Sequence, residues 1–155
     1  YRAAPIIGGA VLAGPEQALY APANRNELLG HCVDASPEQA AAAMRQAAAA
    51  YRRWEMTPVS TRAAALDRAG RLMQEKMPEL VALIVREGGR TQGDAVSEVR
   101  EAIDFCHYYA KEGRNHFSAP LELPGPTGEK NRLSLHGRGV FVCISPWNFP
   151  LAIFV

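Results

Sequence analysis

The middle of the chain, from about residue 36 to residue 112, repeats apolar positions at helical spacing. Ser36-Pro37-Glu38-Gln39 predicts the first helix start: the serine can cap it, the proline suits the first helical position, and the glutamine completes a capping box. The run Ala40–Ala50 continues this helix to about Trp54, because alanine is the best helix former. Thr57-Pro58 then predicts its end.

A second helical pattern begins near Ser60 and restarts at Pro78. Its predicted apolar face has the i, i+3, i+4 spacing of a buried stripe and consists of Leu66, Ala69, Leu72, Met73 and Met77. The predicted polar face consists of Arg62, Asp67, Arg68, Arg71, Gln74 and Glu75. Beyond Pro78 an apolar body runs to Gly88-Gly89, where glycine favours a helix end. The methionines are interpreted as core residues rather than as part of a cofactor site.

The third helical pattern runs from about Gly93 to Glu112. Its predicted buried positions are Val96, Val99, Ala102, Ile103, Cys106 and Tyr109. Two carboxylates, Glu98 and Asp104, also lie on this helix, and their ordinary interpretation is that water or neighbouring cations satisfy them. We accept that interpretation for Asp104 and return to Glu98 below.

Both ends of the chain are predicted to contain strands. Ile6–Val11 and Leu28–Val33 read as two short strands, with a turn cluster at Pro22–Asn26, and together they suggest a hairpin with a long loop. Residues 113–136 read as loop and hairpin, in which Arg132–His136 alternates as a strand should. The sequence thus predicts an α/β chain that is helix-rich in its first two-thirds.

The C-terminal stretch predicts a buried strand followed by an irregular turn. Val140–Ile144 is a short apolar run rich in β-branched residues, as expected of a strand covered on both faces. Ser145-Pro146 ends the predicted strand, because proline removes a hydrogen-bond donor. Pro150 suits the first turn of a following helix. Ligands bind at the carboxyl ends of strands in open α/β sheets, so this turn is a candidate site.

Asn148 is the candidate catalytic side chain of that turn. Its carboxamide can donate to a developing negative oxygen without adding a titratable charge, and removing such a donor typically lowers turnover by about 10²–10³. The alternative is that Asn148 caps the helix predicted to start at Pro150, because asparagine is a preferred cap. On chemistry alone, the capping role is favoured.

The seven residues Ile144-Ser145-Pro146-Trp147-Asn148-Phe149-Pro150 resemble the signature at which aldehyde dehydrogenases enter their NAD-binding domain. The longer run Cys143–Phe154 is similar to the aldehyde dehydrogenase half of the bacterial bifunctional proline-utilisation proteins, as is Ser97–Phe105. The resemblance implies an aldehyde dehydrogenase-like fold in which a helix-rich portion leads into a Rossmann-like NAD-binding domain. Its parts are strands and hairpin at 1–35, helices at 36–113, loop and hairpin at 114–136, and the first strand and turn of the NAD-binding region at 137–155.

The resemblance also implies a reaction: oxidation of L-glutamate γ-semialdehyde, formed from Δ¹-pyrroline-5-carboxylate, to L-glutamate with NAD⁺ in proline catabolism. It places Asn148 at the oxyanion, Phe149 at the wall of the substrate channel and Glu98 near the aldehyde. The residues implied to line the cofactor cleft are Ile144, Ser145, Pro146 and Trp147. FAD belongs only to the proline dehydrogenase half, and no residue of that half is expected in this chain.

Arg90 occupies a position where the family usually has lysine, within a segment that resembles its Glu-x-Gly-Lys pattern. The positive charge is kept, and a structural role is expected. The family's β-hairpin near residues 113–136 supports subunit association, so the resemblance implies a homo-oligomer.

An aldehyde dehydrogenase also needs a cysteine nucleophile and a carboxylate base. Cys143 lies in the predicted buried strand, where an apolar environment raises a thiol pKa. Cys106 lies on the predicted core face of a helix, and Cys32 at a strand end. The resemblance places the nucleophile, the base and the elements that grip the cofactor phosphates beyond Val155. We therefore expect the chain to be a slice of a longer enzyme.

Composition narrows the function classes. Of the 155 residues, 48% are hydrophobic and 21% charged, and the net charge of +1 favours neither a nucleic-acid nor an anionic-membrane partner. Three widely separated cysteines indicate neither a disulfide scaffold nor a zinc site, and they favour a reducing cytoplasm. The four histidines have no metal-ligand spacing, so no metal is expected.

Three alternatives stay open. The chain could belong to another NAD(P)-dependent aldehyde dehydrogenase, for example one that acts on succinate semialdehyde. It could be a truncated, non-catalytic module that acts only in association. A generic helical binding domain accounts for the alanine-rich helices but leaves Ser145–Pro150 unexplained.

Overall fold

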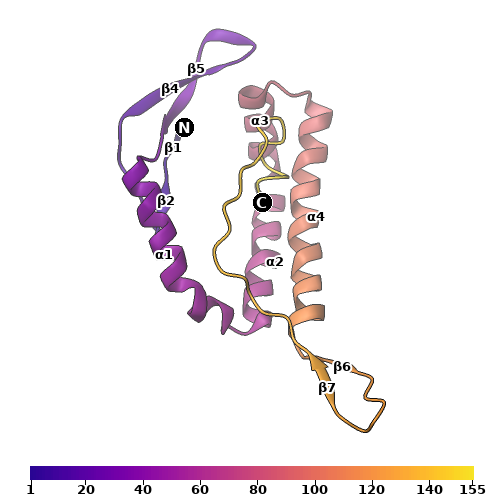
Figure 1. The fold of residues 1–155 in the computed structure, drawn as a ribbon. Helices are drawn as coiled ribbons and strands as arrows, with labels where there is room; N and C mark the ends of the chain where they lie inside the picture. Colours follow the sequence, from indigo (N-terminus) through magenta and orange to yellow (C-terminus); the bar gives the residue numbers. More distant parts are fainter.

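The computed structural model describes residues 1–155 and places four helices between two β-containing ends (Figure 1). α2 (Val59–Glu75) and α3 (Met77–Gly88) follow one another along the side of the long helix α4 (Gln92–Phe117), whereas α1 (Pro37–Glu55) diverges from them. The strands are β1 (Arg2–Ala3), β2 (Ile6–Ile7), β3 (Ala10–Val11), β4 (Glu16–Ala21), β5 (Asn24–Val33), β6 (Leu121–Leu123) and β7 (Asn131–Leu133). None of the helices has the length and apolar character needed to cross a bilayer.

The helix boundaries follow local signals in the sequence. The Ser36 side chain accepts from Gln39 N, and the Gln39 side chain accepts from Ser36 N, which confirms the predicted capping box. Gly89 adopts the left-handed conformation (φ 64°) at the end of α3, as its position predicted. Thr91 then caps α4 by accepting a hydrogen bond from Asp94 N.

The N-terminal strands differ from the prediction. Residues 6–11 form a small hairpin, β2–β3, rather than one strand, because Gly8 (φ 61°) and Gly9 (φ 82°) adopt the turn conformation that glycine permits. The larger hairpin pairs β4 with β5 through a tight turn at Pro22, and β1 adds to β5 in parallel. The predicted long-loop pairing of residues 6–11 with 28–33 is therefore wrong.

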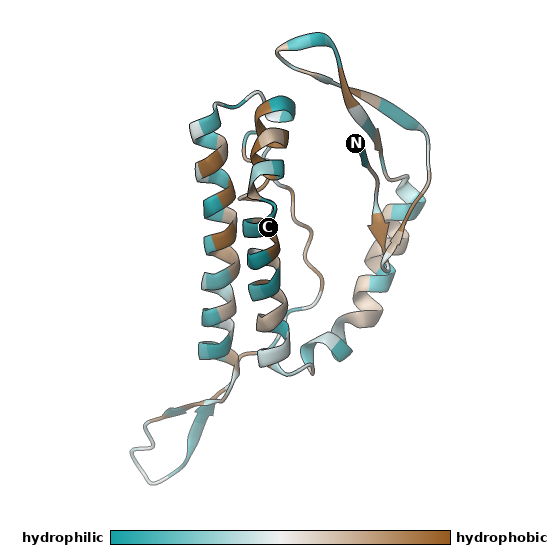
Figure 2. Cartoon of the chain, turned by 180° about the vertical axis from the view of Figure 1, so that it is seen from behind, coloured by the Kyte–Doolittle hydropathy of each residue, from teal (hydrophilic) through white to brown (hydrophobic).

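A small core joins α3 to α4. Its buried members are Ile84, Ala95, Val99 and Ile103. Partly buried residues from α2, α3 and the C-terminal turn surround it, namely Met73, Met77, Leu80, Val81, Val85 and Leu151. Figure 2 shows that the hydrophobic colour on α3 and α4 is interrupted by hydrophilic residues, whereas α1 has mostly the pale tone of its alanines. No residue of α1 is fully buried.

The buried face of α2 is rotated from the predicted one. Its fully buried residues are Ala63 and Gly70, whereas Leu66 and Leu72 are substantially exposed. Asp67, predicted on the polar face, points toward α4. The face is rotated because α2 and α4 approach closely at Gly70, where a Cβ atom would come within 2.9 Å of His107 Nε2. Helix contact here depends on small residues rather than on large apolar ones.

The C-terminal stretch also departs from the prediction. Residues 137–146 form no regular secondary structure and pair with no strand of the chain. Ile144 is 92% exposed and Cys143 is exposed, so the predicted buried strand at 140–144 is wrong in this structure. A strand depends on hydrogen bonds to a neighbour, and β6 and β7 pair only with each other. The predicted helix at Pro150 is a short turn.

The start of the 137–146 segment is attached to α1. The Tyr51 hydroxyl donates a hydrogen bond to the Gly137 carbonyl, and His136 Nδ1 lies 2.9 Å from Glu55 Oε1. The other end is attached to α4, through the residues described next.

Candidate functional site

The candidate site forms where the 147–154 turn meets the start of α4. Glu98 projects from α4 and is only 2% exposed. Its Oε1 accepts hydrogen bonds from Leu151 N, at 2.8 Å, and Ala152 N, at 3.4 Å. These N–H groups lie just after Pro150 and have no earlier backbone partner. Glu98 therefore fixes the turn from outside it.

Arg90 lies in the short connection between α3 and α4 and contacts the same turn. Its Nη1 donates a hydrogen bond to the backbone oxygen of Asn148 and lies 3.4 Å from Glu98 Oε2. Its guanidinium carbon lies 5.0 Å from the centre of the Phe149 ring, within the range of a cation–π contact. The left-handed Gly89 and the cap at Thr91 position the arginine here.

The charges of this pair are largely removed from water. The Glu98 side chain is 1% exposed and that of Arg90 22%. A buried carboxylate requires a compensating cation, which Arg90 supplies. Two atoms, Glu98 Oε2 and Arg90 Nε, are buried without a hydrogen-bond partner in the chain. The pair thus compensates charge while using only part of its hydrogen-bonding capacity.

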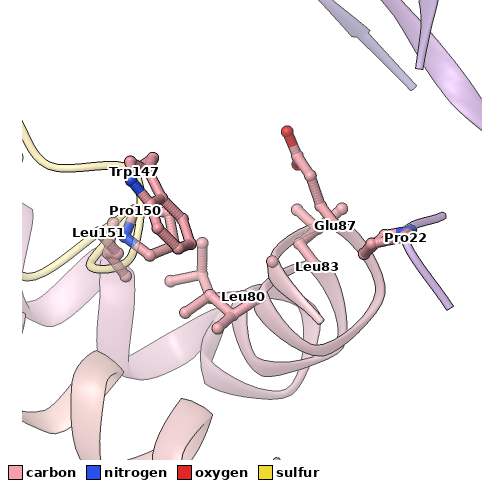
Figure 3. A pocket seen from close by; sticks show the side chains of 9 residues that line it. Pro22, Leu80, Leu83, Glu87, Trp147, Pro150 and Leu151 are labelled. Atoms are coloured by element: carbon pink, nitrogen blue, oxygen red, sulfur yellow. The ribbon is translucent and has the colours of Figure 1, made fainter. Parts of the chain in front are cut away.

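An apolar pocket of about 530 Å³ adjoins the turn (Figure 3). Figure 3 shows Trp147, Pro150 and Leu151 at one side, facing Leu80 of α3, with Pro22 at the far side. The complete lining is Pro22, Leu80, Leu83, Ile84, Glu87, Gly88, Trp147, Pro150 and Leu151. Glu87 is the only charged residue of the lining, so the pocket suits a mainly apolar or flat ring surface.

Asn148 is exposed, and its carboxamide makes no hydrogen bond within the chain. The structure does not give it the alternative capping role, because no helix follows and Glu98 accepts from the N–H groups of Leu151 and Ala152. Only the Asn148 backbone oxygen is engaged, by Arg90. This arrangement holds the backbone of Asn148 and leaves its side-chain donor available.

The remaining predicted site residues lie around this centre. Ile144 and Trp147 are highly exposed, Pro146 is exposed and Ser145 is half-buried. Phe149 is half-buried under Arg90. The structure brings Glu98, Asn148 and Phe149 together through Arg90, while their roles toward substrate and cofactor stay predictions.

Residues 144–147 fit one wall of a dinucleotide site rather than a whole one. Of these residues Trp147 lines the apolar pocket and is highly exposed, so its indole can pack against a flat ring. No cationic side chain lines the pocket to bind a phosphate. No group of three or more His, Cys, Asp or Glu side chains is placed to hold a metal ion.

The cysteines occupy different surroundings. Burial raises the pKa of Cys106, which lies in the helix core as predicted. Cys143 is exposed, so the prediction that burial makes it unreactive is wrong in this structure. Its burial was predicted from an apolar run that pairs with no strand of residues 1–155.

The sequence predicts a structural role for Arg90 but does not predict its partners. The partners are 8 and 58 residues away, so no local pattern places them together. One signal was present: a carboxylate, Glu98, at a position whose neighbours Ala95, Val99 and Ala102 are apolar predicts a nearby cation.

Comparison with known proteins gives consistent similarities. The family model described as "Aldehyde dehydrogenase family" matches residues 13–155. The bifunctional protein PutA of Escherichia coli (strain K12) is 38% identical over 154 residues, which are 99% of this chain and 11% of that protein. The chain therefore spans about a tenth of the length of this curated relative.

Two solved structures resemble the chain along nearly its whole length. A 1-pyrroline-5-carboxylate dehydrogenase R100A mutant from Thermus thermophilus matches with a TM-score of 0.88 at 34% identity, over 99% of this chain and 30% of that one. A 3,6-anhydro-L-galactose dehydrogenase in complex with NAP matches with a TM-score of 0.82 at 26% identity, over 99% of this chain and 32% of that one.

Proposed function

The chain belongs to the aldehyde dehydrogenase family, and on that premise we propose that it is part of an NAD-dependent enzyme that oxidises L-glutamate γ-semialdehyde to L-glutamate. Family membership confirms the predicted aldehyde dehydrogenase-like α/β fold, of which the chain covers a part. It also makes the protein an oxidoreductase of a family that typically uses NAD(P).

The substrate proposal is supported by relatives and by sequence. A similar structure is that of a 1-pyrroline-5-carboxylate dehydrogenase, and a similar protein is a bifunctional PutA. The proposed reaction converts the aldehyde, NAD⁺ and water into the carboxylate, NADH and protons. We further propose that it takes place in the cytoplasm and that a proline dehydrogenase unit, with FAD, belongs to the same protein.

The observation that carries the proposal is the free carboxamide of Asn148 on a backbone held by Arg90. When a thiolate attacks the aldehyde carbon, the carbonyl oxygen gains negative charge. The Asn148 N–H₂ group is proposed to donate to this oxygen, which stabilises it without a proton transfer. Bound NAD⁺ supplies the hydride acceptor, and Ile144, Ser145, Pro146 and Trp147 are proposed to line its site. Phe149 is proposed to form the channel wall, and Glu98 to lie near the aldehyde.

The test is NADH formation by the full-length protein. We expect glutamate semialdehyde to be oxidised with a higher kcat/KM than succinate semialdehyde. Asn148→Ala should lower kcat by about 10²–10³, the usual loss for one oxyanion donor. A kcat within a few-fold of the unsubstituted protein contradicts the oxyanion role. A preference for succinate semialdehyde contradicts the substrate. Absence of NAD binding favours a non-catalytic module.

The β6–β7 hairpin is proposed to support a homo-oligomer. Four leucines on and beside it are 42–61% exposed, an apolar surface that a partner subunit can cover: Leu121, Leu123, Leu133 and Leu135. Light scattering of full-length Leu121→Lys checks this, with Leu72→Lys on α2 as the control. We expect the Leu121→Lys oligomer to dissociate and the Leu72→Lys oligomer to stay intact. An unchanged particle mass for Leu121→Lys contradicts the proposal.

A further inference from the structure

Arg90 is the one side chain that joins the start of α4 to the backbone of the candidate oxyanion donor. We propose that Arg90 is a positioning residue that sets the location of the Asn148 carboxamide through the Asn148 backbone oxygen, an inference that rests on the proposed function. Arg90 donates to that oxygen, and its distance of 3.4 Å from Glu98 Oε2 ties it to α4.

Two side chains from outside the turn hold its backbone at Asn148 and just after it. Arg90 donates a hydrogen bond to the backbone carbonyl oxygen of Asn148. Glu98 accepts hydrogen bonds from Leu151 N and Ala152 N, three and four residues later. Within the turn itself, the backbone bond near Asn148 is long, at 3.4 Å from Phe149 N to the Pro146 oxygen. The position of Asn148 therefore depends on the two side chains from outside the turn more than on the turn's own bonds.

The guanidinium fits this task because it is planar. Its Nη1 donates to the Asn148 oxygen, and its central carbon lies 5.0 Å from the centre of the Phe149 ring. Both contacts are to consecutive residues, so they restrain the backbone in two directions. Arg90 is also three-quarters buried, which limits competition from water for the donated hydrogen bond.

A double-mutant cycle distinguishes positioning from a general structural role. In the full-length protein we expect Arg90→Met to lower kcat by about 10-fold, since small displacements of a reacting group can cost up to about 10²-fold. In an Asn148→Ala background the same substitution should lower kcat by less than about 2-fold, because nothing is left to position. Equal losses in both backgrounds overturn the inference.

The failure of each proposal is separable. If Asn148→Ala alone retains its turnover, the oxyanion role fails and Arg90 cannot act through it. If Asn148→Ala loses turnover but the two substitutions are additive, only the positioning role fails. If Arg90→Met leaves kcat unchanged, the positioning role also fails.

Two further variants control for folding and charge. Arg90→Met leaves the buried Glu98 carboxylate without its cation. The cycle is therefore repeated in a Glu98→Gln background, in which the amide oxygen can still accept from Leu151 N. Arg90→Lys keeps the charge and a donor for the Asn148 oxygen but loses the planar contact with Phe149, so its kcat should lie between those of the unsubstituted protein and Arg90→Met. Arg86→Met removes an exposed arginine paired with Glu27 and should leave kcat unchanged.

Discussion

Near each end of α4 an arginine pairs with a carboxylate, but the surroundings of the two pairs differ. Near its start, Glu98 is 1% exposed and meets Arg90. Near its end, Arg114 binds Asp67 of α2 at 2.6 Å, and His107 lies 3.0 Å from the same carboxylate, with all three side chains 24–45% exposed. The first pair holds a loop, and the second joins two regular helices.

The comparison indicates that burial, rather than the number of partners, determines how much a charge pair contributes to stability. Asp67 has two cationic or hydrogen-bonding partners, yet water competes for them. Glu98 has one cation and two backbone donors, and little water reaches it. Removing one member of the pair should therefore lower the free energy of unfolding far more at the start of α4 than at its end.

The largest expected effect is at Glu98. Glu98→Ala leaves Arg90 without its compensating charge and two N–H groups without an acceptor. We expect the free energy of unfolding of the full-length protein to fall by about 3–5 kcal/mol, the usual loss when one member of a buried pair is removed. Urea denaturation measures it. A loss no larger than that of Asp67→Ala contradicts the comparison.

A smaller effect is expected at Asp67. Asp67→Ala removes the exposed contact with Arg114 and His107, and typical surface pairs contribute less than about 1 kcal/mol. The same urea titration checks it. A loss as large as that of Glu98→Ala would show that exposure does not separate the two pairs.

The pH dependence of Asp67 follows from its partners. Arg114, and then His107, hold the pKa of Asp67 below its usual value of 3.8. Because the folded pKa is lowered, this carboxylate stabilises the fold above the unfolded pKa, and the contribution is lost as pH falls through the folded value. Stability of the unsubstituted protein should thus decline more steeply below about pH 4 than that of Asp67→Asn, as acid titration of the unfolding midpoint can measure.

The smallest expected effect is that of salt. Raising ionic strength to about 1 M shortens the screening length to about 3 Å, which weakens the exposed contacts of Asp67 and leaves the buried pair of Glu98 nearly unchanged. The destabilisation by Asp67→Ala should shrink in high salt, while that by Glu98→Ala should persist. Equal salt sensitivity contradicts the difference in solvent access.

The helices could be predicted from the sequence because their signals are local. The capping box at Ser36 and the left-handed glycine at Gly89 each lie within a few residues of the boundary that they set. The buried face of α2 was mispredicted because a glycine, Gly70, rather than the larger Leu66 or Leu72, allows the close contact with α4. The spacing of apolar residues alone does not predict close helix packing at a small residue.

The candidate site was predictable only in part. Resemblance drew attention to Asn148 and Glu98, but neither residue's partners can be read locally, because Glu98 and Leu151 are 53 residues apart. The strand predicted at Val140–Ile144 failed for a related reason. Its apolar composition is a local property, whereas a strand needs a neighbour, and none of the strands of residues 1–155 lies beside it.

The attachment of residues 137–146 at both ends has a consequence for assembly. Tyr51 holds the segment at Gly137, and Arg90 holds the chain again at Asn148, so the conformations of the intervening backbone are restricted although no strand pairs with it. Ordering a free residue costs about 1–2 kcal/mol of conformational entropy. Because both ends are already held, a strand that paired with this segment would lose less conformational entropy than one that paired with a free chain.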